Sequence, residues 1–156
     1  MADKYERMIQ LVTEFFDVKN DPEQLNVNED VMEKLNKIHP ACMSEYNEGD
    51  GPIVWILIIP TTEATMKRFL SKEISETQLL NETPIGGKYD AIYLCSASVL
   101  EEYRRKGLAS QVGFDAIKKI MKDHTVKALY YWSFSPEGQA LAEKAAEELN
   151  LPLYKR

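Results

Sequence analysis

Hydrophobic residues in the first quarter of the chain recur at the spacing of helices. Between Asp3 and Phe16 they return every three or four positions, which places them on one face of an amphipathic helix. A second helix is predicted from a cap at Asn28 to a stop just before Pro40. The inward-facing positions are Tyr5, Met8, Ile9, Val12, Phe15 and Phe16 in the first helix, and Val31, Met32, Leu35 and Ile38 in the second.

Three later runs of apolar residues lack helical spacing and predict β-strands. Residues 53–59 read IVWILII, without alternation, which is typical of a strand buried on both faces in the centre of a sheet. Residues 91–99 predict a second interior strand, and residues 126–134 a third. We expect the aromatic side chains of the third strand, Tyr130, Tyr131, Trp132 and Phe134, to pack between helices, with the lining of an acyl pocket as the alternative. The segment LPLYKR, 151–156, is expected to form a short terminal strand.

Helical spacing returns between these strands. One helix is predicted over residues 62–74, capped by Thr61 or Thr62, and residues 47–52 and 82–90 are interpreted as a turn and a loop. Strands that alternate with helices predict a single α/β or α+β domain over residues 1–156, with a mixed central sheet flanked by helices. Two further helices are predicted over residues 108–121 and from Ser135 or Pro136 to about Leu149, with Asn150 as C-cap.

Composition narrows the classes of partner. The 156 residues carry a formal net charge of −6 and a pI of about 5.0, which argues against nucleic acid because that partner needs a basic face. The N-terminal segment lacks the apolar core of a signal peptide, and the longest apolar run is too short to span a bilayer. We therefore expect a cytoplasmic protein with no membrane partner. Cys42 and Cys95 lack metal-like spacing, so we expect buried thiols and no metal site.

Positive charge nevertheless gathers at one turn, EEYRRKGLAS, residues 101–110. The run Arg104, Arg105 and Lys106 precedes Gly107 where a predicted strand leads into a predicted helix. The first N–H groups of a helix lack intrahelical partners and carry positive potential, and the small residues that follow leave them accessible. A glycine permits close approach and backbone angles that a Cβ forbids. The turn therefore predicts a phosphate site, to which arginine side chains are well suited, with a solvated surface turn as the alternative.

This segment resembles a known family. The residues RRKGLA, 104–109, match R/Q-x-x-G-x-G/A, the acyl-CoA pyrophosphate loop of the GNAT superfamily of N-acyltransferases. The strand before the loop, the helix after it and the following strand–helix unit agree with that family over about residues 90–150. The resemblance implies a GNAT-like fold, acetyl-CoA as cosubstrate, and direct transfer of an acetyl group to a small amine acceptor in a ternary complex.

The resemblance also implies which residues hold the cosubstrate. The backbone of residues 97–99 would pair with the pantetheine amides as an added strand does, and this strand would part from the next one to open a cleft. The N–H groups of the turn would hold the pyrophosphate, with Arg104 at the R/Q position. The implied CoA-binding residues are Ala97, Ser98, Val99, Arg104, Arg105, Lys106, Gly107, Leu108, Ala109 and Ser110.

The catalytic residues are less clearly marked. Many family members use a tyrosine early in the helix after the fifth strand as the acid for the leaving thiolate, and the matching stretch SFSPEGQALAEKAA has none. Either Tyr130 or Tyr131 would reach the cleft from the strand, since neighbours face opposite ways, and we take Tyr131 and Ser133 as candidates. No base is assigned. Glu101, Glu102 and Asp90 are interpreted as solvated turn residues, and His39 and His124 as residues that serve the C-termini of the helices they follow.

The predicted architecture departs from the family in two places. Family members have three antiparallel strands in succession before the loop, whereas here a helix separates residues 53–59 from residues 91–99, and a further strand could lie only in the 82–90 region. With a helix in its place, the two strands would become parallel neighbours. The chain also reaches Arg156 without the family's last hairpin, so we expect a domain shortened on the acceptor side.

An acyltransferase is thus the first expectation. The missing tyrosine supports an alternative from another class, a non-catalytic CoA- or nucleotide-binding regulatory module that keeps the loop. A protein-interaction domain without a phosphate ligand is the third. The sequence leaves the acceptor, the base and the oligomeric state open.

Overall fold

The structure, a computed structural model, describes residues 4–19, 29–49, 51–133 and 135–156, with the side chains of residues 12–19 outside the description. Some predicted features therefore lie outside the described residues: the inward packing of Val12, Phe15 and Phe16, the cap at Asn28, and the strand residue Phe134.

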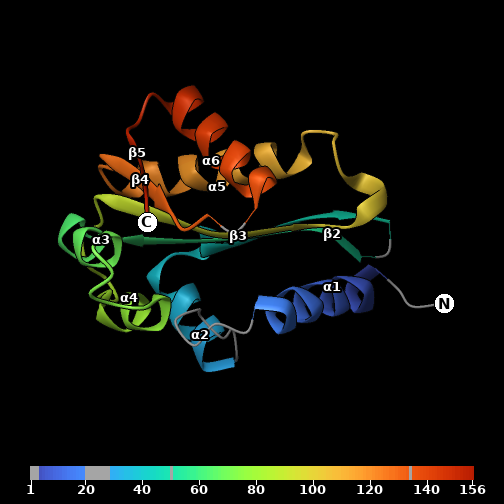
Figure 1. The fold of residues 1–156 in the computed structure, drawn as a ribbon, viewed down its shortest axis with the longest axis horizontal. Coiled ribbons are helices and arrows are strands. Elements are labelled where there is room, and N and C mark those ends of the chain that lie inside the picture. Colours follow the sequence, from blue (N-terminus) through green and yellow to red (C-terminus); the bar gives the residue numbers. More distant parts are fainter. Residues whose placement is uncertain (1–3, 20–28, 50, 134) are drawn as a thin grey trace.

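The described chain forms a five-stranded mixed sheet with helices on both faces (Figure 1). The strands are β1 (Met43–Glu48), β2 (Gly51–Thr61), β3 (Ala91–Val99), β4 (Ala128–Tyr131) and β5 (Leu153–Lys155). The α-helices are α1 (Lys4–Lys19), α2 (Glu29–Ile38), α3 (Glu63–Leu70), α4 (Glu76–Glu82), α5 (Leu108–Asp123) and α6 (Pro136–Leu149), and the 3-10 helices are η1 (Pro40–Cys42) and η2 (Glu101–Tyr103).

The strands lie across the sheet in their chain order, β1-β2-β3-β4-β5. β1, β2 and β3 are antiparallel, whereas β3, β4 and β5 are parallel and are connected through α5 and α6. Figure 1 shows α5 and α6 on one face of the sheet, and α1, α2 and α4 on the other. The predicted class, a mixed α/β arrangement with a mixed sheet flanked by helices, is confirmed.

β2 is the central strand of the antiparallel part. Leu57 and Ile59 pack in a hydrophobic cluster with α2, α3 and α4, whereas Ile56 and Ile58 pack in a second cluster that includes α5. Because both faces of the strand are buried, apolar residues occupy consecutive positions, which is the pattern seen in IVWILII. The prediction of a central strand is confirmed.

The expectation that residues 53–59 and 91–99 would be parallel neighbours is wrong. Val54 pairs with Val99 and Thr61 with Ala91, in antiparallel register. The chain leaves β2 at Thr61 and, after α3 and α4, returns beside the same point, where the Asp90 N–H donates to the Thr61 carbonyl oxygen (3.0 Å). The two helices are therefore an excursion from one end of the sheet and not a crossover, so β3 must run back along β2.

The hydrophobic pattern does not predict β1. Its sequence, MSEYNE, has no apolar run, and its side chains are half-buried or exposed, as suits an edge strand. With β1 in place, three antiparallel strands follow one another, so the additional strand precedes residues 53–59 and does not lie in the 82–90 region.

The single helix predicted over residues 62–74 is two helices. α3 ends at Leu70, and Lys72 beyond it has a left-handed φ of 68°. α4 begins after Ser75, whose hydroxyl accepts from the Gln78 N–H (3.2 Å) while the Gln78 side chain accepts from the Ser75 N–H (2.9 Å). This reciprocal capping box is readable in the sequence as S-x-x-Q.

Other element ends agree more closely with expectation. Thr62, and not Thr61, caps α3 by accepting from the Thr65 N–H (3.2 Å). Ser135 caps α6 by accepting from the Gly138 N–H (3.0 Å), and Asn150 ends this helix with a left-handed φ of 56°. β4 is shorter than predicted, because its regular pairing ends at Tyr131.

Two of the polar residues that received no catalytic role have structural roles that the sequence did not predict. The backbone N–H of His39 donates to the Leu35 carbonyl oxygen at the end of α2 (3.0 Å), as predicted. Its side chain has a second role: Nδ1 accepts from the Ala41 N–H (3.0 Å) and caps η1, and Nε2 lies 2.7 Å from Asp123 Oδ2. Asp90 is not a solvated turn residue, because its carboxylate accepts from the first N–H of α3, at Glu63 (2.7 Å). His124 is the C-cap of α5, as predicted.

The cap of α4 gives a test of this part of the fold. Replacing Ser75 with alanine removes an acceptor for the first turn and should lower the free energy of unfolding by about 1 kcal/mol. Ser75→Asp keeps a capping oxygen and should remain close to the parent in urea denaturation. An aspartate variant as unstable as the alanine variant would contradict this role of Ser75.

Candidate functional site

β3 and β4 stay together only at one end. Their parallel pairing runs from Ala91 with Ala128 to Leu94 with Tyr131, while β3 continues to Val99 along β2. Cys95 marks the point of departure: Ile58 of β2 pairs with Leu94 and Leu57 pairs with Ser96, so Cys95 is an extra, bulged residue. A bulge bends and twists its strand, and here it turns β3 away from β4.

A cleft of about 750 Å³ lies where the strands part. One wall comes from residues 94–99 of β3, another from residues 131–133 after β4, and the rest from the beginnings of α5 and α6. Nine of the ten residues predicted to bind CoA line this cleft: Ala97, Ser98, Val99, Arg104, Arg105, Gly107, Leu108, Ala109 and Ser110.

The β3 wall offers a strand edge. Ala97, Ser98 and Val99 pair with β2 on one side, and within the described residues no strand pairs with them on the other. The Val99 carbonyl oxygen accepts from Arg104 Nε (3.0 Å). Backbone groups of the other residues remain available to an extended ligand, as in recognition by strand addition.

The N-terminus of α5 opens on the same cleft. Gly107 is its N-cap residue with a left-handed φ of 76°, and no side chain in the described part of the chain caps it. A Cβ on Gly107 would meet nothing within 4 Å, so the glycine is needed for its backbone angle and not for space. The N–H groups at the start of this 16-residue helix therefore add positive potential to the cleft.

The three cationic side chains of the basic turn have different contacts. Arg104 donates one of its five N–H groups to the Val99 carbonyl oxygen, and this bond holds its side chain along the end of β3. Arg105 lines the cleft and is held at a left-handed φ of 64°. Lys106 is not part of the cleft lining, because its Nζ lies over the ring of Tyr103, 5.6 Å from the centroid.

Two further cations, which the sequence pattern did not single out, approach the turn from α1. Arg7 Nη2 donates to both carboxylate oxygens of Glu102 (2.5 and 2.8 Å), and this bond lowers the pKa of the Glu102 carboxyl from its ordinary value. Lys4 Nζ lies 5.5 Å from the centroid of the Tyr103 ring. Glu102 therefore pairs with Arg7 at the turn, close to the cations of the loop.

Of the two tyrosines on β4, Tyr131 faces the cleft. It is 6% exposed, and burial raises the pKa of its hydroxyl, with the Glu143 carboxylate raising it further. Tyr130 points to the opposite face, where it packs against Phe69 and Tyr93. The register of β4 on β3 thus decides which of the two tyrosines reaches the cleft.

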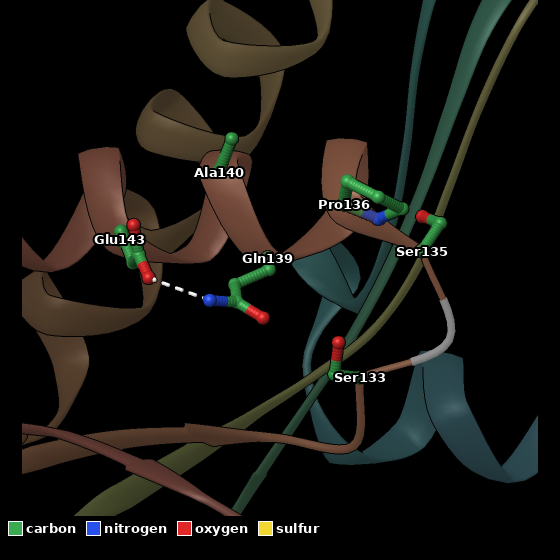
Figure 2. Close-up of a pocket in the computed structure, with 6 residues that line it drawn as sticks. All are labelled: Ser133, Ser135, Pro136, Gln139, Ala140 and Glu143. Carbon is green, nitrogen blue, oxygen red and sulfur yellow. Dashed lines mark hydrogen bonds between the residues drawn. The ribbon is translucent and has the colours of Figure 1, made fainter.

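Ser133 lies where the cleft meets a second, shallower hollow of about 470 Å³. Figure 2 shows its hydroxyl directed toward α6, on which Gln139 Nε2 donates to Glu143 Oε1 (3.0 Å). Ser135 and Pro136 complete the rim of this hollow at the start of the helix. Ser133 can therefore orient a group in either space through its hydroxyl.

The carboxylates around the cleft are exposed, whereas a glutamate of α4 is buried. Glu101 and Glu102 are exposed on η2, as expected of turn residues, and exposed Glu137 lies at the α6 end of the cleft lining. Glu76, in the first turn of α4, is 3% exposed and accepts a hydrogen bond from the Tyr93 hydroxyl. The pattern of a short amphipathic helix would place a first-turn glutamate in solvent, so the sequence carries no signal for this burial.

Cys95 connects the buried glutamate to the cleft. It lines the cleft, and its Sγ lies 3.7 Å from Glu76 Oε2 as a hydrogen-bond donor. Burial raises the pKa of the Cys95 thiol well above its ordinary value, and the Glu76 carboxylate raises it further. A thiol that stays protonated at neutral pH is a poor nucleophile, so the arrangement favours direct transfer over a covalent intermediate on cysteine.

Comparison with models of known protein families found no match to this chain, and comparison with curated proteins found no matching relative. Within the described residues no group of three or more histidine, cysteine, aspartate or glutamate side chains could hold a metal ion. No described helix is long and apolar enough to cross a membrane.

The raised pKa of Cys95 predicts slow alkylation. At pH 8 the thiol should react with iodoacetamide more slowly than free cysteine, because a raised pKa lowers the fraction of the reactive thiolate. Glu76→Gln removes a negative charge beside the sulfur and should speed the reaction. Mass spectrometry of the modified peptide measures both rates, and the unfolded protein is the control. Alkylation of the folded protein at the rate of free cysteine would contradict the raised pKa.

Proposed function

We propose that the protein binds an acyl-CoA in the cleft between β3 and β4 and transfers its acyl group, an acetyl group, to a small amine. The observation that carries the proposal is the parting of β3 from β4 beside the uncapped N-terminus of α5. These two features supply, in one cleft, a strand edge for amides and a positive end for phosphates.

The GNAT resemblance and the fold support each other. Three antiparallel strands, β1, β2 and β3, come before the basic turn. α5, β4 and α6 follow the turn in that order, and β4 is parallel to β3. This order of elements agrees with that of the family. The excursion through α3 and α4 lies between the second and third of these strands and leaves their pairing intact. The first of the two departures from the family is thus an addition at one end of the sheet.

The cosubstrate would lie along β3. Its pantetheine amides would pair with the free edge of residues 97–99, and its pyrophosphate would meet the N–H groups of Arg105, Gly107, Ala109 and Ser110. Arg104 lies at the junction of these two regions and has donors left for a phosphate oxygen. The thioester would then reach the apex where pairing ends, next to Tyr131.

The reaction requires little from the protein beyond the orientation of the amine and the thioester. The neutral amine nitrogen of the acceptor attacks the thioester carbonyl carbon, a C–N bond forms, and the C–S bond breaks with its electron pair on sulfur. The Tyr131 hydroxyl gives its proton to the leaving thiolate, and the proton that the amine loses passes to water. The raised pKa keeps Tyr131 protonated at neutral pH but makes it a weaker acid than an ordinary tyrosine.

One observation favours the second candidate, a CoA- or nucleotide-binding module without catalysis. The carboxylate of the described cleft lining, Glu137, is exposed, and no histidine joins that lining, so an enclosed base is absent from it. Binding of CoA without thiol release, tested over a broad panel of amines, would favour the module. Thiol release that depends on an amine would exclude it.

Isothermal titration with CoA and acetyl-CoA tests the binding step. Arg104→Ala should weaken binding roughly tenfold, because a charge-assisted hydrogen bond to phosphate is lost. Gly107→Glu, which places a charged side chain at a left-handed position, should abolish binding when combined with it. Lys119→Ala, a charge change at an exposed position of the same helix, should leave the affinity unchanged. No heat of binding at millimolar ligand would sink the proposal.

Kinetics of thiol release test Tyr131. Tyr131→Phe should lower kcat about a hundredfold, the lower end for loss of a general acid, because its raised pKa makes it a weak one. The affinity for acetyl-CoA should not change, because the ring remains. Ser133→Ala is the comparison for a residue that orients without donating to sulfur. An unchanged kcat in the tyrosine variant would assign the acid elsewhere.

A further inference from the structure

The shallower hollow beside α6 adjoins the cleft and contains a carboxylate. Its volume is about 470 Å³, and it shares Ser133, Ser135 and Ala140 with the cleft lining. The two spaces therefore meet at the segment that follows β4 and at the first turns of α6. We call this space the α6 hollow, and the described residues that line it are Ser133, Ser135, Pro136, Gln139, Ala140 and Glu143.

The charge of the α6 hollow comes from Glu143. Among the described residues of the lining, Glu143 alone has a charged side chain. Its Oε1 accepts from Gln139 Nε2 (3.0 Å), so a neutral amide orients the carboxylate (Figure 2). Within the described part of the chain no salt bridge involves Glu143. The hollow therefore presents a fixed carboxylate whose negative charge is not balanced by a salt-bridged cation of these residues.

Neutral oxygen atoms accompany this carboxylate. Figure 2 shows the Ser133 hydroxyl directed toward α6 and the Gln139 amide oxygen turned away from Glu143, on the side of Ser133. The Ser135 hydroxyl is different, because it already accepts from the Gly138 N–H (3.0 Å) as the cap of α6. An ammonium group has three N–H donors and no acceptor. The carboxylate, the amide oxygen and the Ser133 hydroxyl are acceptors that suit such a group.

The charge of Glu143 also acts on the cleft. Burial raises the pKa of the Tyr131 hydroxyl, and the Glu143 carboxylate raises it further, because a nearby negative charge disfavours loss of the proton. A cation bound beside Glu143 would offset that charge and bring the pKa of Tyr131 back toward its ordinary value. Tyr131 would then be a stronger acid with a cation in the α6 hollow than without one.

The cleft and the α6 hollow suit ligands of opposite charge. Arg104, Arg105 and the N-terminus of α5 give the cleft positive potential, and neither arginine lines the hollow. A phosphate group would be attracted to that end of the cleft and repelled by the Glu143 carboxylate. The proposed cosubstrate would therefore leave the α6 hollow to a second, cationic ligand.

From this arrangement we infer that the α6 hollow binds an alkylammonium group through the Glu143 carboxylate. A second step rests on the proposed function: the acceptor is an aliphatic diamine, and the hollow holds one of its ends as an ammonium group. The other nitrogen, in its neutral form, enters the cleft past the shared residue Ser133 and attacks the thioester beside Tyr131. The bonds formed and broken are those of the proposed transfer. Binding of the ammonium group itself does not depend on the transferase activity.

Nuclear magnetic resonance tests the α6 hollow without CoA. The side-chain amide of Gln139 donates to Glu143, so its signals should shift in a saturable way with 1,4-diaminobutane at neutral pH. Gln139→Ala assigns these signals, and the side-chain amide of Gln111, which is exposed on α5 outside both linings, should not shift. 1,4-Butanediol, a neutral molecule of similar length, should give no saturable shift. A shift of equal size and midpoint with the diol would overturn the inference.

A matched pair of variants assigns the binding to Glu143. Glu143→Gln keeps the shape of the side chain and removes its charge, so the midpoint for 1,4-diaminobutane should rise about threefold, as is typical for the loss of an exposed ion pair. Glu148→Gln, the same change at an exposed position of α6 outside the hollow, should leave the midpoint unchanged. High salt should weaken binding to the parent more than binding to Glu143→Gln. An unchanged midpoint in Glu143→Gln, or no saturable shift in the parent, would refute the site.

The outcomes separate this inference from the proposed function. Saturable diamine binding without any affinity for CoA would retain the α6 hollow and reject the transferase, and affinity for CoA without diamine binding would do the reverse. If both bind, 1,4-diaminobutane should be acetylated with a lower KM than butylamine, and Glu143→Gln should reduce that difference while Glu148→Gln should not. Equal KM values for diamines and for monoamines of the same chain length, from three to six carbons, would reject the role of the hollow in holding the acceptor.

Discussion

The separation of β3 from β4 is the constraint on which the rest of the structure depends. If β3 and β4 were paired along their whole length, their backbone N–H and C=O groups would bond to each other, and no cleft would lie between them. The bulge at Cys95 turns β3 away after Leu94, while β2 continues to hold it on the other side. The open edge, the entrance to α5 and the position of Tyr131 all follow from that one irregularity in the register.

The two faces of the sheet carry different kinds of side chain. On one face α5 brings its N-terminus and two arginines to the cleft, a combination suited to phosphate oxygens. On the other, Phe69 of α3 packs against Tyr93 and Tyr130, and the Tyr93 hydroxyl donates to the buried Glu76 of α4.

The sequence predicts those parts of the fold that are locally determined. β2 and β3 are long apolar runs, α5 and α6 have clear periodicity, and Ser135 and Asn150 are recognisable caps. β1 is missed because a polar edge strand is stabilised by its neighbour and not by its own pattern. The cleft residues at 97–110 are predictable because a contiguous motif carries them, whereas Glu76 meets Tyr93 and Cys95 only through the packing of α4 on β3. Lys106 shows the limit of a motif: it lies in the predicted turn, but its Nζ lies over the Tyr103 ring and the residue does not line the cleft.

The contacts of α1 with the turn have a consequence for how the loop meets a ligand. Arg7 on Glu102 and Lys4 over Tyr103 anchor the turn to a helix almost a hundred residues away in sequence. A loop whose left-handed residues are fixed before binding loses little conformational freedom when a ligand arrives. By reciprocity, any ligand that favours this shape of the turn also favours docking of α1 on the sheet. Docking of α1 and binding of a ligand in the cleft would therefore stabilise each other, although Lys4 and Arg7 do not line the cleft.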